Sequence, residues 1–291
     1  MKIEMNNISK QFGKKKALRE ISLNLEEKKI YGLLGRNGAG KTTLMQLIAG
    51  YERPTAGTIL VNGEEPYENC NVTEKICFIN ESGNFKNTLK ISETLYICSL
   101  FHPQWDHQTA RYLLNQFNLD PSSKVKALSK GMESALGIVV GLSSKAPVTI
   151  FDEPYIGLDA AARKRFYELL IEEYTRQPRT FILSTHLIDE VSMLFEEVIM
   201  MAEGRIMLWE EAETLRQSSL MIHGTKESID SFVGNKKVLH RSTFAGQESA
   251  VLFGENLSRQ EAIDAGLRIE SVPVQELMVY LTEHTKGEKS A

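Results

Sequence analysis

The sequence predicts a largely parallel α/β fold followed by a small α+β domain, and three observations support this prediction. Short apolar strands such as residues 29–35 and 147–154 alternate with amphipathic helices. A glycine-rich loop, Gly35–Thr43, joins one such strand directly to a helix. After about residue 210 the order becomes strand, helix, strand, strand, helix, strand, which is typical of a ferredoxin-like domain. We therefore expect an α/β domain over 1–210 and a C-terminal accessory domain over 211–291.

The first third of the chain is expected to form a mixed sheet around one helix. Two strands meet near Gly13, and Gly50 ends the helix that follows the glycine-rich loop. The expected strands cover 2–8, 17–27, 29–35, 57–65 and 74–80, and the helix covers 41–50.

A helical insertion is expected over about residues 85–144, before the α/β alternation resumes. Within it, Ser92 and Asp106 are expected to cap helices 93–101 and 107–117, and Pro103 ends the first of these. A third helix follows Leu128–Met132. Beyond the insertion we expect strands 147–154 and 179–186, helices 160–177 and 187–195, and a hairpin over 197–210.

The C-terminal domain is expected to begin with strand 219–224 and helix 226–233. Strands 236–244 and 248–254, helix 258–266, strand 267–272 and a final helix 273–284 complete it. The pattern predicts a fold here but no activity, because one fold supports many functions.

Composition excludes some classes of function. A net charge of −4 argues against a mainly electrostatic nucleic-acid binder, so no nucleic-acid partner is expected. The run Lys14–Lys16 is interpreted as a solvated hairpin tip. Three cysteines without a CxxC pair indicate reduced, buried or half-buried thiols. The longest apolar run, 135–142, is too short to span a bilayer, so the chain is not expected to cross a membrane by itself.

The strongest chemical signal is Gly35-x4-Gly40-Lys41-Thr42. Glycines allow backbone N–H groups to turn toward phosphate oxygens, and the helix start adds its positive dipole end. Lys41 can reach the outer phosphates, and the Thr42 hydroxyl can bind Mg²⁺. The sequence therefore predicts a nucleotide phosphate site formed by Gly35, Arg36, Asn37, Gly38, Ala39, Gly40, Lys41, Thr42 and Thr43.

Two adjacent acids follow the apolar strand that ends in "IFDEP". Asp152 can place a carboxylate near the Mg²⁺ of the glycine-rich loop. Glu153 is then available to polarise a water molecule for attack on the γ-phosphate.

A second possible anion site lies at "LSKGM", residues 128–132. Ser129 offers a hydroxyl and Gly131 offers backbone access at the start of a helix, where N–H groups favour anions. Two anion sites in one chain raise the question of whether both serve one ligand.

These motifs together resemble the ATP-binding subunits of ABC transporters. The resemblance covers roughly residues 1–210 and rests on "GRNGAGKTT", "LSKGM", "IFDEPYIGLD" and the histidine of "ILSTH", in that order. It implies an ATPase that uses ATP and Mg²⁺ and that pairs head to tail with a second ATPase subunit. In such a pair, Ser129 and Gly131 of one copy face the nucleotide held by Lys41 of the other.

The resemblance also implies roles for three further residues. Phe12 would stack on adenine, with a simple core phenylalanine as the equal alternative. His186 would contact the γ-phosphate, and Asp159 would lie in the loop that crosses to the partner subunit.

Two departures from the family pattern concern the family's signature motif, which falls at residues 128–132, and its glutamine loop, which falls at residues 78–82. Lys130 and Met132 replace a glycine and the glutamine of the signature, while Ser129 and Gly131 remain. Glu81 stands where the family carries its metal-binding glutamine, so it keeps an oxygen for the metal and adds negative charge. We expect this charge to alter how movement of the transport partner couples to hydrolysis.

The implied partners are separate transmembrane permease subunits, which would hold the chain peripherally at the cytoplasmic face of the membrane. Candidate contacts are Phe85, Leu100, Phe101 and Trp105, and for each a place in the core of the insertion is the equal alternative.

The layout resembles the acetoin-utilisation and cell-envelope stress transporters of Gram-positive bacteria, with acetoin or another small molecule as cargo. A soluble cofactor-assembly ATPase remains the alternative. A chromosome-maintenance ATPase is disfavoured because no heptad run separates Lys41 from Leu128, and a two-cassette translation factor because one cassette is present.

Overall fold

The computed structural model describes residues 1–185, 194–244, 247–254, 257–273, 276–277 and 279–281. The chain divides into two compact units. The first contains Met1–His186 with Met201–Ile206, and the second contains Leu187–Met200 with Met207–Ala291. Residues 187–193 of the predicted helix 187–195 and part of the final helix lie outside the described residues.

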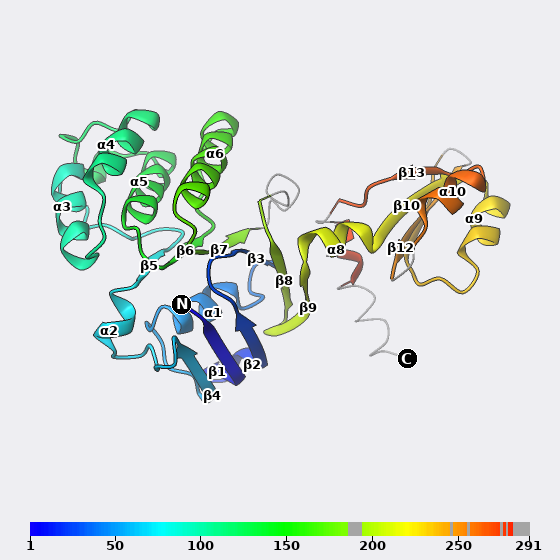
Figure 1. The fold of residues 1–291 in the computed structure, drawn as a ribbon, viewed down its shortest axis with the longest axis horizontal. Helices are drawn as coiled ribbons and strands as arrows, with labels where there is room; N and C mark the ends of the chain where they lie inside the picture. The colour runs from blue at the N-terminus through cyan, green and yellow to red at the C-terminus, as the bar shows by residue number, and fades with distance from the viewer. Residues whose placement is uncertain (186–193, 245–246, 255–256, 274–275, 278, 282–291) are drawn as a thin grey trace. The chain divides into compact units, whose positions relative to one another are not determined.

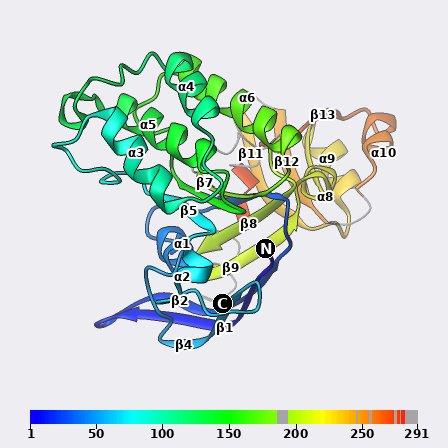
Figure 2. The same cartoon turned by 60° about the vertical axis from the view of Figure 1, so that its left-hand side comes forward.

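An antiparallel sheet of three strands, in the order β2-β1-β4, forms one layer of the first unit (Figure 1). Its strands are β1 Ile3–Phe12, β2 Lys15–Leu25 and β4 Ala56–Val61. Helix α1, Lys41–Ile48, contacts β2 and β4 on this side and β6 of a larger sheet on the other. Its buried face, which includes Leu44, Leu47 and Ile48, therefore joins the two layers (Figure 2).

The larger sheet has the order β5-β6-β7-β3-β8-β9. Its strands are β3 Ile30–Leu34, β5 Ile76–Ile79, β6 Val148–Asp152, β7 Thr180–Thr185, β8 Glu197–Ala202 and β9 Arg205–Glu211. β3, β5, β6 and β7 pair in parallel, and their residues are buried throughout, which explains the apolar runs seen in the sequence. The carboxyl ends of β3, β6 and β7 consequently lie together at one edge of the sheet.

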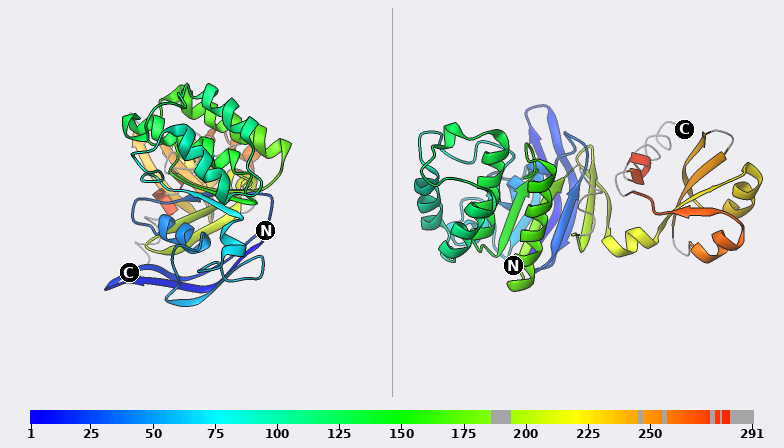
Figure 3. Two further views of the ribbon diagram at one scale, coloured as in Figure 1. Left: turned by 90° about the vertical axis from the view of Figure 1, so that its left-hand side faces the viewer. Right: turned by 90° about the horizontal axis from the view of Figure 1, so that it is seen from above.

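Helices gather at the β5 side of this sheet (Figures 1 and 3). They are α2 Cys70–Thr73, α3 Ile91–Phe101, α4 His107–Gln116, the short 3₁₀ turn Val125–Ala127, α5 Lys130–Ser143 and α6 Ala160–Arg176. The buried residues of α5 pack against β5 and β6, so this helix connects the insertion to the sheet. None of the helices in the described residues combines the length and apolarity needed to cross a bilayer.

Helix caps confirm one sequence expectation and correct another. Asp106 caps α4 by accepting the N–H groups of Gln108 and Thr109, as predicted. The prediction that Ser92 caps α3 was wrong, because the helix begins two residues earlier, at Ile91, with Lys90 at the cap position. The Glu93 carboxylate accepts the Lys90 N–H at 2.8 Å, which closes the helix start without a serine cap.

The cysteines are free, as expected, but they differ in exposure. Cys77 is buried in β5, and burial raises the pKa of its thiol to about 12, so it stays protonated. Cys70 is exposed, so the expectation that all three are at least half buried was wrong for this residue.

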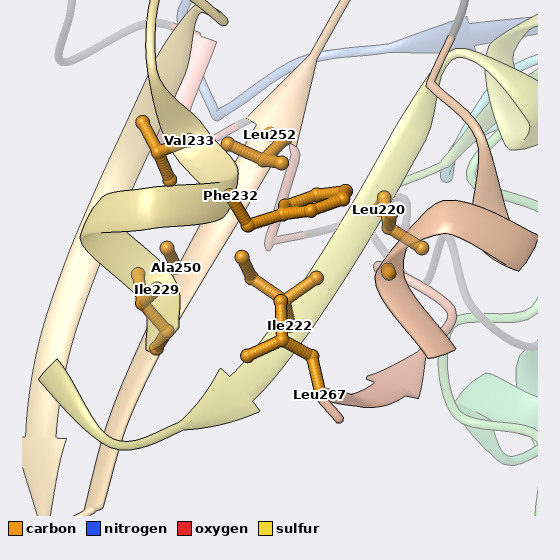
Figure 4. Packing of buried hydrophobic residues seen from close by; sticks show 9 residues of the cluster. Leu220, Ile222, Ile229, Phe232, Val233, Ala250, Leu252 and Leu267 are labelled. Atoms are coloured by element: carbon orange, nitrogen blue, oxygen red, sulfur yellow. The ribbon is translucent and has the colours of Figure 1, made fainter. Parts of the chain in front are cut away.

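The second unit holds a four-stranded antiparallel sheet in the order β11-β12-β10-β13. Its elements are α8 Ala212–Gln217, β10 Ser219–Gly224, α9 Lys226–Val233, β11 Val238–Phe244, β12 Gln247–Phe253, α10 Arg259–Asp264 and β13 Arg268–Glu270. From β10 onward the elements follow the order expected for a ferredoxin-like domain. Apolar side chains of α9, α10 and the strands form its core (Figure 4).

Candidate functional site

The glycine-rich loop lies between the end of β3 and the start of α1. Gly40 adopts a left-handed backbone with a φ of 108°, and a Cβ there would lie 2.8 Å from the carbonyl oxygen of Ala17. Only glycine fits this position without strain. The Lys41 ammonium donates a hydrogen bond of 2.6 Å to the carbonyl of Gly35, so the lysine side chain folds back across the loop.

A pocket of ≈ 370 Å³ opens beside this loop. Seven consecutive loop and helix residues line it, together with three acids and three residues that the motifs did not single out. The lining residues are Asn37, Gly38, Ala39, Gly40, Lys41, Thr42, Thr43, Glu81, Asp152, Glu153, Lys15, Ala17 and Ile156. The predicted phosphate-loop residues and all three predicted acids are thus brought to one place, apart from Gly35 and Arg36, whose carbonyls act within the loop.

Asp152 links the loop to the neighbouring strands through two short hydrogen bonds. The Thr42 hydroxyl donates to one of its carboxylate oxygens at 2.6 Å, and the Ser184 hydroxyl donates to the other, also at 2.6 Å. Ser184 reaches Asp152 because β6 and β7 pair in parallel with these two residues in register. The two hydrogen bonds fix the buried carboxylate beside Thr42 and satisfy both of its oxygens.

Glu153 lies next to Lys41 at the floor of the pocket. One carboxylate oxygen lies 3.4 Å from the Lys41 ammonium, and the Tyr155 hydroxyl contacts the other oxygen at 3.4 Å. The backbone of Glu153 is left-handed, with a φ of 48°, which costs a non-glycine residue about 1–2 kcal/mol. Its N–H donates to the Ser184 hydroxyl at 2.9 Å, and this bond helps to hold the unfavourable conformation.

Charges in the pocket partly cancel. Lys41, Asp152 and Glu153 are buried, with exposed fractions of 6%, 4% and 7%, so one cation faces two anions. Glu81 is exposed at the rim and adds a further negative charge. Buried acids in excess of buried bases favour a site for a cation bound together with an anionic ligand.

The donor set fits Mg²⁺. Thr42 and Asp152 present oxygens only 2.6 Å apart, and Mg²⁺ commonly uses one or two protein oxygens completed by phosphates and water. In the described part of the chain no group of three or more His, Cys, Asp or Glu side chains could hold a metal by itself. A site completed by a phosphate-bearing ligand is therefore the arrangement these residues suit.

Several predicted residues lie away from the pocket lining. Ser129 caps α5 by accepting the Met132 N–H at 3.2 Å, and Asp159 caps α6 by accepting the Ala162 N–H at 2.8 Å. A Cβ at Gly131 would lie 2.2 Å from the carbonyl oxygen of Gly157, so close packing within the chain already requires glycine there.

The two remaining predicted residues are Phe12 and His186. The Phe12 ring is 43% exposed, with the Lys10 ammonium 4.8 Å from its centroid. His186 lies outside the described residues.

Sequence reasoning missed two polar residues of this site. Ser184 stands near the end of a buried strand, and the only signal for it is a hydroxyl pair, Ser184-Thr185, where an apolar run stops. Lys15 belongs to a run interpreted as a solvated hairpin tip. Its side chain is exposed, but it also lines the pocket, so that interpretation was incomplete.

Comparisons with known proteins identify the family of the chain. The profile of the family described as "ABC transporter" matches residues 18–156. The ABC transporter ATP-binding protein NatA of Bacillus subtilis is 31% identical over 230 residues, which cover 74% of this chain and 92% of NatA. The chain belongs to the ABC transporter family. It is an ABC-type ATPase and an ATP-binding subunit of a transporter.

Solved structures show the same fold. An ATP-binding subunit of an ABC transporter has a TM-score of 0.67 at 24% identity and covers 75% of this chain and 92% of its own. A dimeric ATP-binding cassette in a post-hydrolysis state, bound to ADP and Pi, has a TM-score of 0.65 at 21% identity and covers 72% and 98%. The predicted α/β P-loop ATPase class is therefore confirmed.

Proposed function

We propose that the chain binds Mg²⁺-ATP in the pocket beside Lys41 and hydrolyses it to drive separate membrane-spanning subunits. The observation that carries this proposal is the chain of contacts from Thr42 through Asp152 to Ser184 and the Glu153 N–H. It brings the Thr42 and Asp152 oxygens and the Glu153 carboxylate together in one pocket beside the glycine-rich loop, which supports a role for them in binding and hydrolysing Mg²⁺-ATP.

Phosphate binding uses the loop and the two lysines of the pocket. Backbone N–H groups of residues 37–42 and the dipole of α1 favour the phosphates, and Lys41 neutralises their charge. Phosphate oxygens would compete with Glu153 for the Lys41 ammonium, which frees the carboxylate to accept a proton. Lys15 adds positive charge at the pocket rim.

Thr42 and Asp152 would hold Mg²⁺, with Glu81 as a further oxygen. The ion, when bound, offsets the negative charge of the phosphates and of the transition state. Ser184 keeps the Asp152 carboxylate oriented for this role by donating to its other oxygen.

Glu153 acts as the general base in hydrolysis. Its carboxylate takes a proton from water as the water oxygen forms a bond to the γ-phosphorus. The bond from that phosphorus to the bridging oxygen breaks, and its electron pair leaves with ADP. The buried position beside Lys41 fixes the carboxylate at the floor of the pocket.

Two copies would enclose each ATP between them. Ser129 and Gly131 at the start of α5 offer a hydroxyl and N–H groups to the γ-phosphate held by Lys41 of the other copy. Asp159 would lie at the contact between copies, Phe12 would stack on adenine through its exposed ring, and His186 would contact the γ-phosphate. Support comes from the related cassette that was solved as a dimer with ADP and Pi.

The membrane partner would be a separate permease that holds the chain peripherally at the cytoplasmic face. Helix α3 supports this with a row of exposed apolar side chains, in which Leu100 and Phe101 are 66% and 69% exposed. Of the other two candidates, Phe85 and Trp105 are only half-buried, so they offer less surface. A soluble assembly partner would be the alternative occupant of the same face.

For cargo we propose a small molecule such as acetoin, on the resemblance of "LSKGM" and the C-terminal extension to the acetoin-utilisation group. The isolated permease complex should then hydrolyse ATP faster with acetoin than without it. Equal rates over the millimolar range would remove acetoin from consideration while leaving the ATPase assignment intact.

The test of the whole proposal uses Glu153→Gln and the partners that purify with the chain from detergent-solubilised membranes. With saturating Mg²⁺-ATP we expect ultracentrifugation to show two ATPase subunits joined, because ATP stays bound without hydrolysis. Lys41→Ala is the matched control and should remain single. A Glu153→Gln chain that stays single with ATP and its partners present would contradict the proposal.

A further inference from the structure

The start of α5 contacts the loop that carries Glu81. The Lys130 ammonium donates a hydrogen bond of 2.8 Å to the carbonyl oxygen of Glu81. From the same turn of the helix, the Glu133 carboxylate accepts the N–H of Gly83 at 3.3 Å. Two side chains of one helical turn therefore fix the backbone of a loop that lines the phosphate pocket.

The same turn also contacts the loop that follows Glu153. The Ser134 hydroxyl donates to the carbonyl oxygen of Ile156 at 2.6 Å, and Ile156 lines the pocket. Gly131 lies against Gly157 so closely that a Cβ there would overlap the Gly157 carbonyl. The start of α5 thus contacts two loops that line the pocket, the one that carries Glu81 and the one that follows Glu153.

Lys130 is an unfavourable residue for the helix itself. It occupies the first position of a helix that begins at Ser129, where the positive end of the dipole disfavours a cation. Its side chain is exposed, so it contributes little to the core. The bond to Glu81 is the contact that accounts for a lysine at this position, and because the acceptor is a backbone oxygen, the bond does not depend on the side chain at 81.

We infer that Lys130 is a positioning residue, which holds the Glu81 loop to the start of α5 so that Glu81 keeps its place at the pocket rim. This inference rests on the proposed ATP site. A movement of the Glu81 loop, such as one imposed by a partner, is then passed to Ser129 and Gly131 through the Lys130 side chain as well as through the loop backbone. Glu133 provides a second, weaker contact between α5 and this loop, because its hydrogen bond to the Gly83 N–H is longer.

Hydrogen exchange of the full-length chain tests the contact directly, with or without ATPase activity. We expect Lys130→Met to speed amide exchange over residues 81–86 by about three- to tenfold, the effect of losing one hydrogen bond. Lys130→Arg should restore slow exchange because a guanidinium can donate to the same carbonyl. Lys126→Met, which removes an exposed cation just before the signature, is the matched control and should match wild type.

Steady-state kinetics separate positioning from a general loss of structure. Lys130→Met should lower kcat by about three- to tenfold and leave the ATP dissociation constant and the midpoint of thermal unfolding close to wild type. Lys130→Arg should recover most of kcat, and Glu133→Ala should lower it less than Lys130→Met does. Unchanged exchange at 81–86 in Lys130→Met, or an equal effect of Lys126→Met, would overturn the inference.

Failure of the ATP site is a separate result. If the wild-type chain with its partners bound no ATP, the proposed function would fall. Exchange at 81–86 would still decide whether Lys130 holds the loop.

Discussion

The two units of the chain use their buried interiors differently. In the first, buried polar side chains meet at the pocket: Ser184 donates a hydrogen bond to Asp152, and Lys41 forms an ion pair with Glu153. In the second, the core cluster consists of nine apolar side chains from α9, α10, the sheet and the residue just before β13. Buried polar groups are expensive unless they are paired, so their concentration in one unit indicates where chemistry occurs. The apolar core of the second unit explains its fold and gives no information about its role.

Substitution at Lys41 should give the largest effect. Lys41→Ala removes the cation that faces Glu153 and that we propose binds the phosphates, so we expect ATP hydrolysis to fall about 100-fold or more. Phosphate release under saturating ATP measures this. Lys164→Ala, at an exposed position on α6, should leave the rate near wild type. Equal losses in both variants would mean that the pocket does not hold the phosphates.

Phe232→Ala should affect the second unit without affecting ATP binding. Phe232 is 9% exposed and packs in the apolar cluster, so its truncation is expected to cost about 3–5 kcal/mol of that unit's unfolding free energy. Denaturant unfolding, monitored by hydrogen exchange over residues 219–253, measures the loss of unfolding free energy. Ile263→Ala, at a side chain that is 50% exposed, should cost far less. A changed ATP dissociation constant in Phe232→Ala would show that the two units are energetically coupled.

Ser184→Ala tests whether a buried hydroxyl supports the acids of the pocket. It removes the donor to Asp152 and the acceptor of the Glu153 N–H, so we expect a stability loss of about 1–3 kcal/mol and a lower kcat. Ser143→Ala is a matched control, because the Ser143 hydroxyl is equally buried and has no hydrogen-bond partner in the described structure. Its removal should be neutral or stabilising. Equal costs at the two serines would assign the effect to packing.

How much could be predicted from the sequence depends on whether a feature is local. The loop Gly35–Thr43 was predictable because its backbone path requires glycine at Gly40, and Asp106 was predictable because a cap acts within one helical turn. Ser92 failed as a cap because Lys90 could begin the same helix with Glu93 closing it, and local propensity does not separate the two starts.

Contacts between distant segments account for what the sequence could not show. Ser184 joins the site only through the register of β6 on β7, and Lys130 reaches Glu81 only because the insertion folds back on the sheet. The left-handed backbone of Glu153 is likewise unexpected for a glutamate. The roles of Asp159, Ser129 and Gly131 at a shared ATP remain predictions, because they depend on a second copy of the chain, and the stacking of Phe12 on adenine remains one because it depends on bound nucleotide.

Glu81→Gln should give the smallest effect and separates charge from position at the pocket rim. The Lys130 bond to the backbone oxygen of residue 81 is retained, so only the negative charge near the phosphates is lost. Because Glu81 is exposed and screened, we expect ATP to bind about two- to fivefold more tightly at low salt, with the difference shrinking as salt is added. Titration of ATP at two ionic strengths, together with partner-stimulated turnover, measures both consequences. Unchanged affinity and unchanged stimulation would show that the charge at 81 has no part in binding or coupling, whereas a salt-independent change would point to altered loop geometry instead.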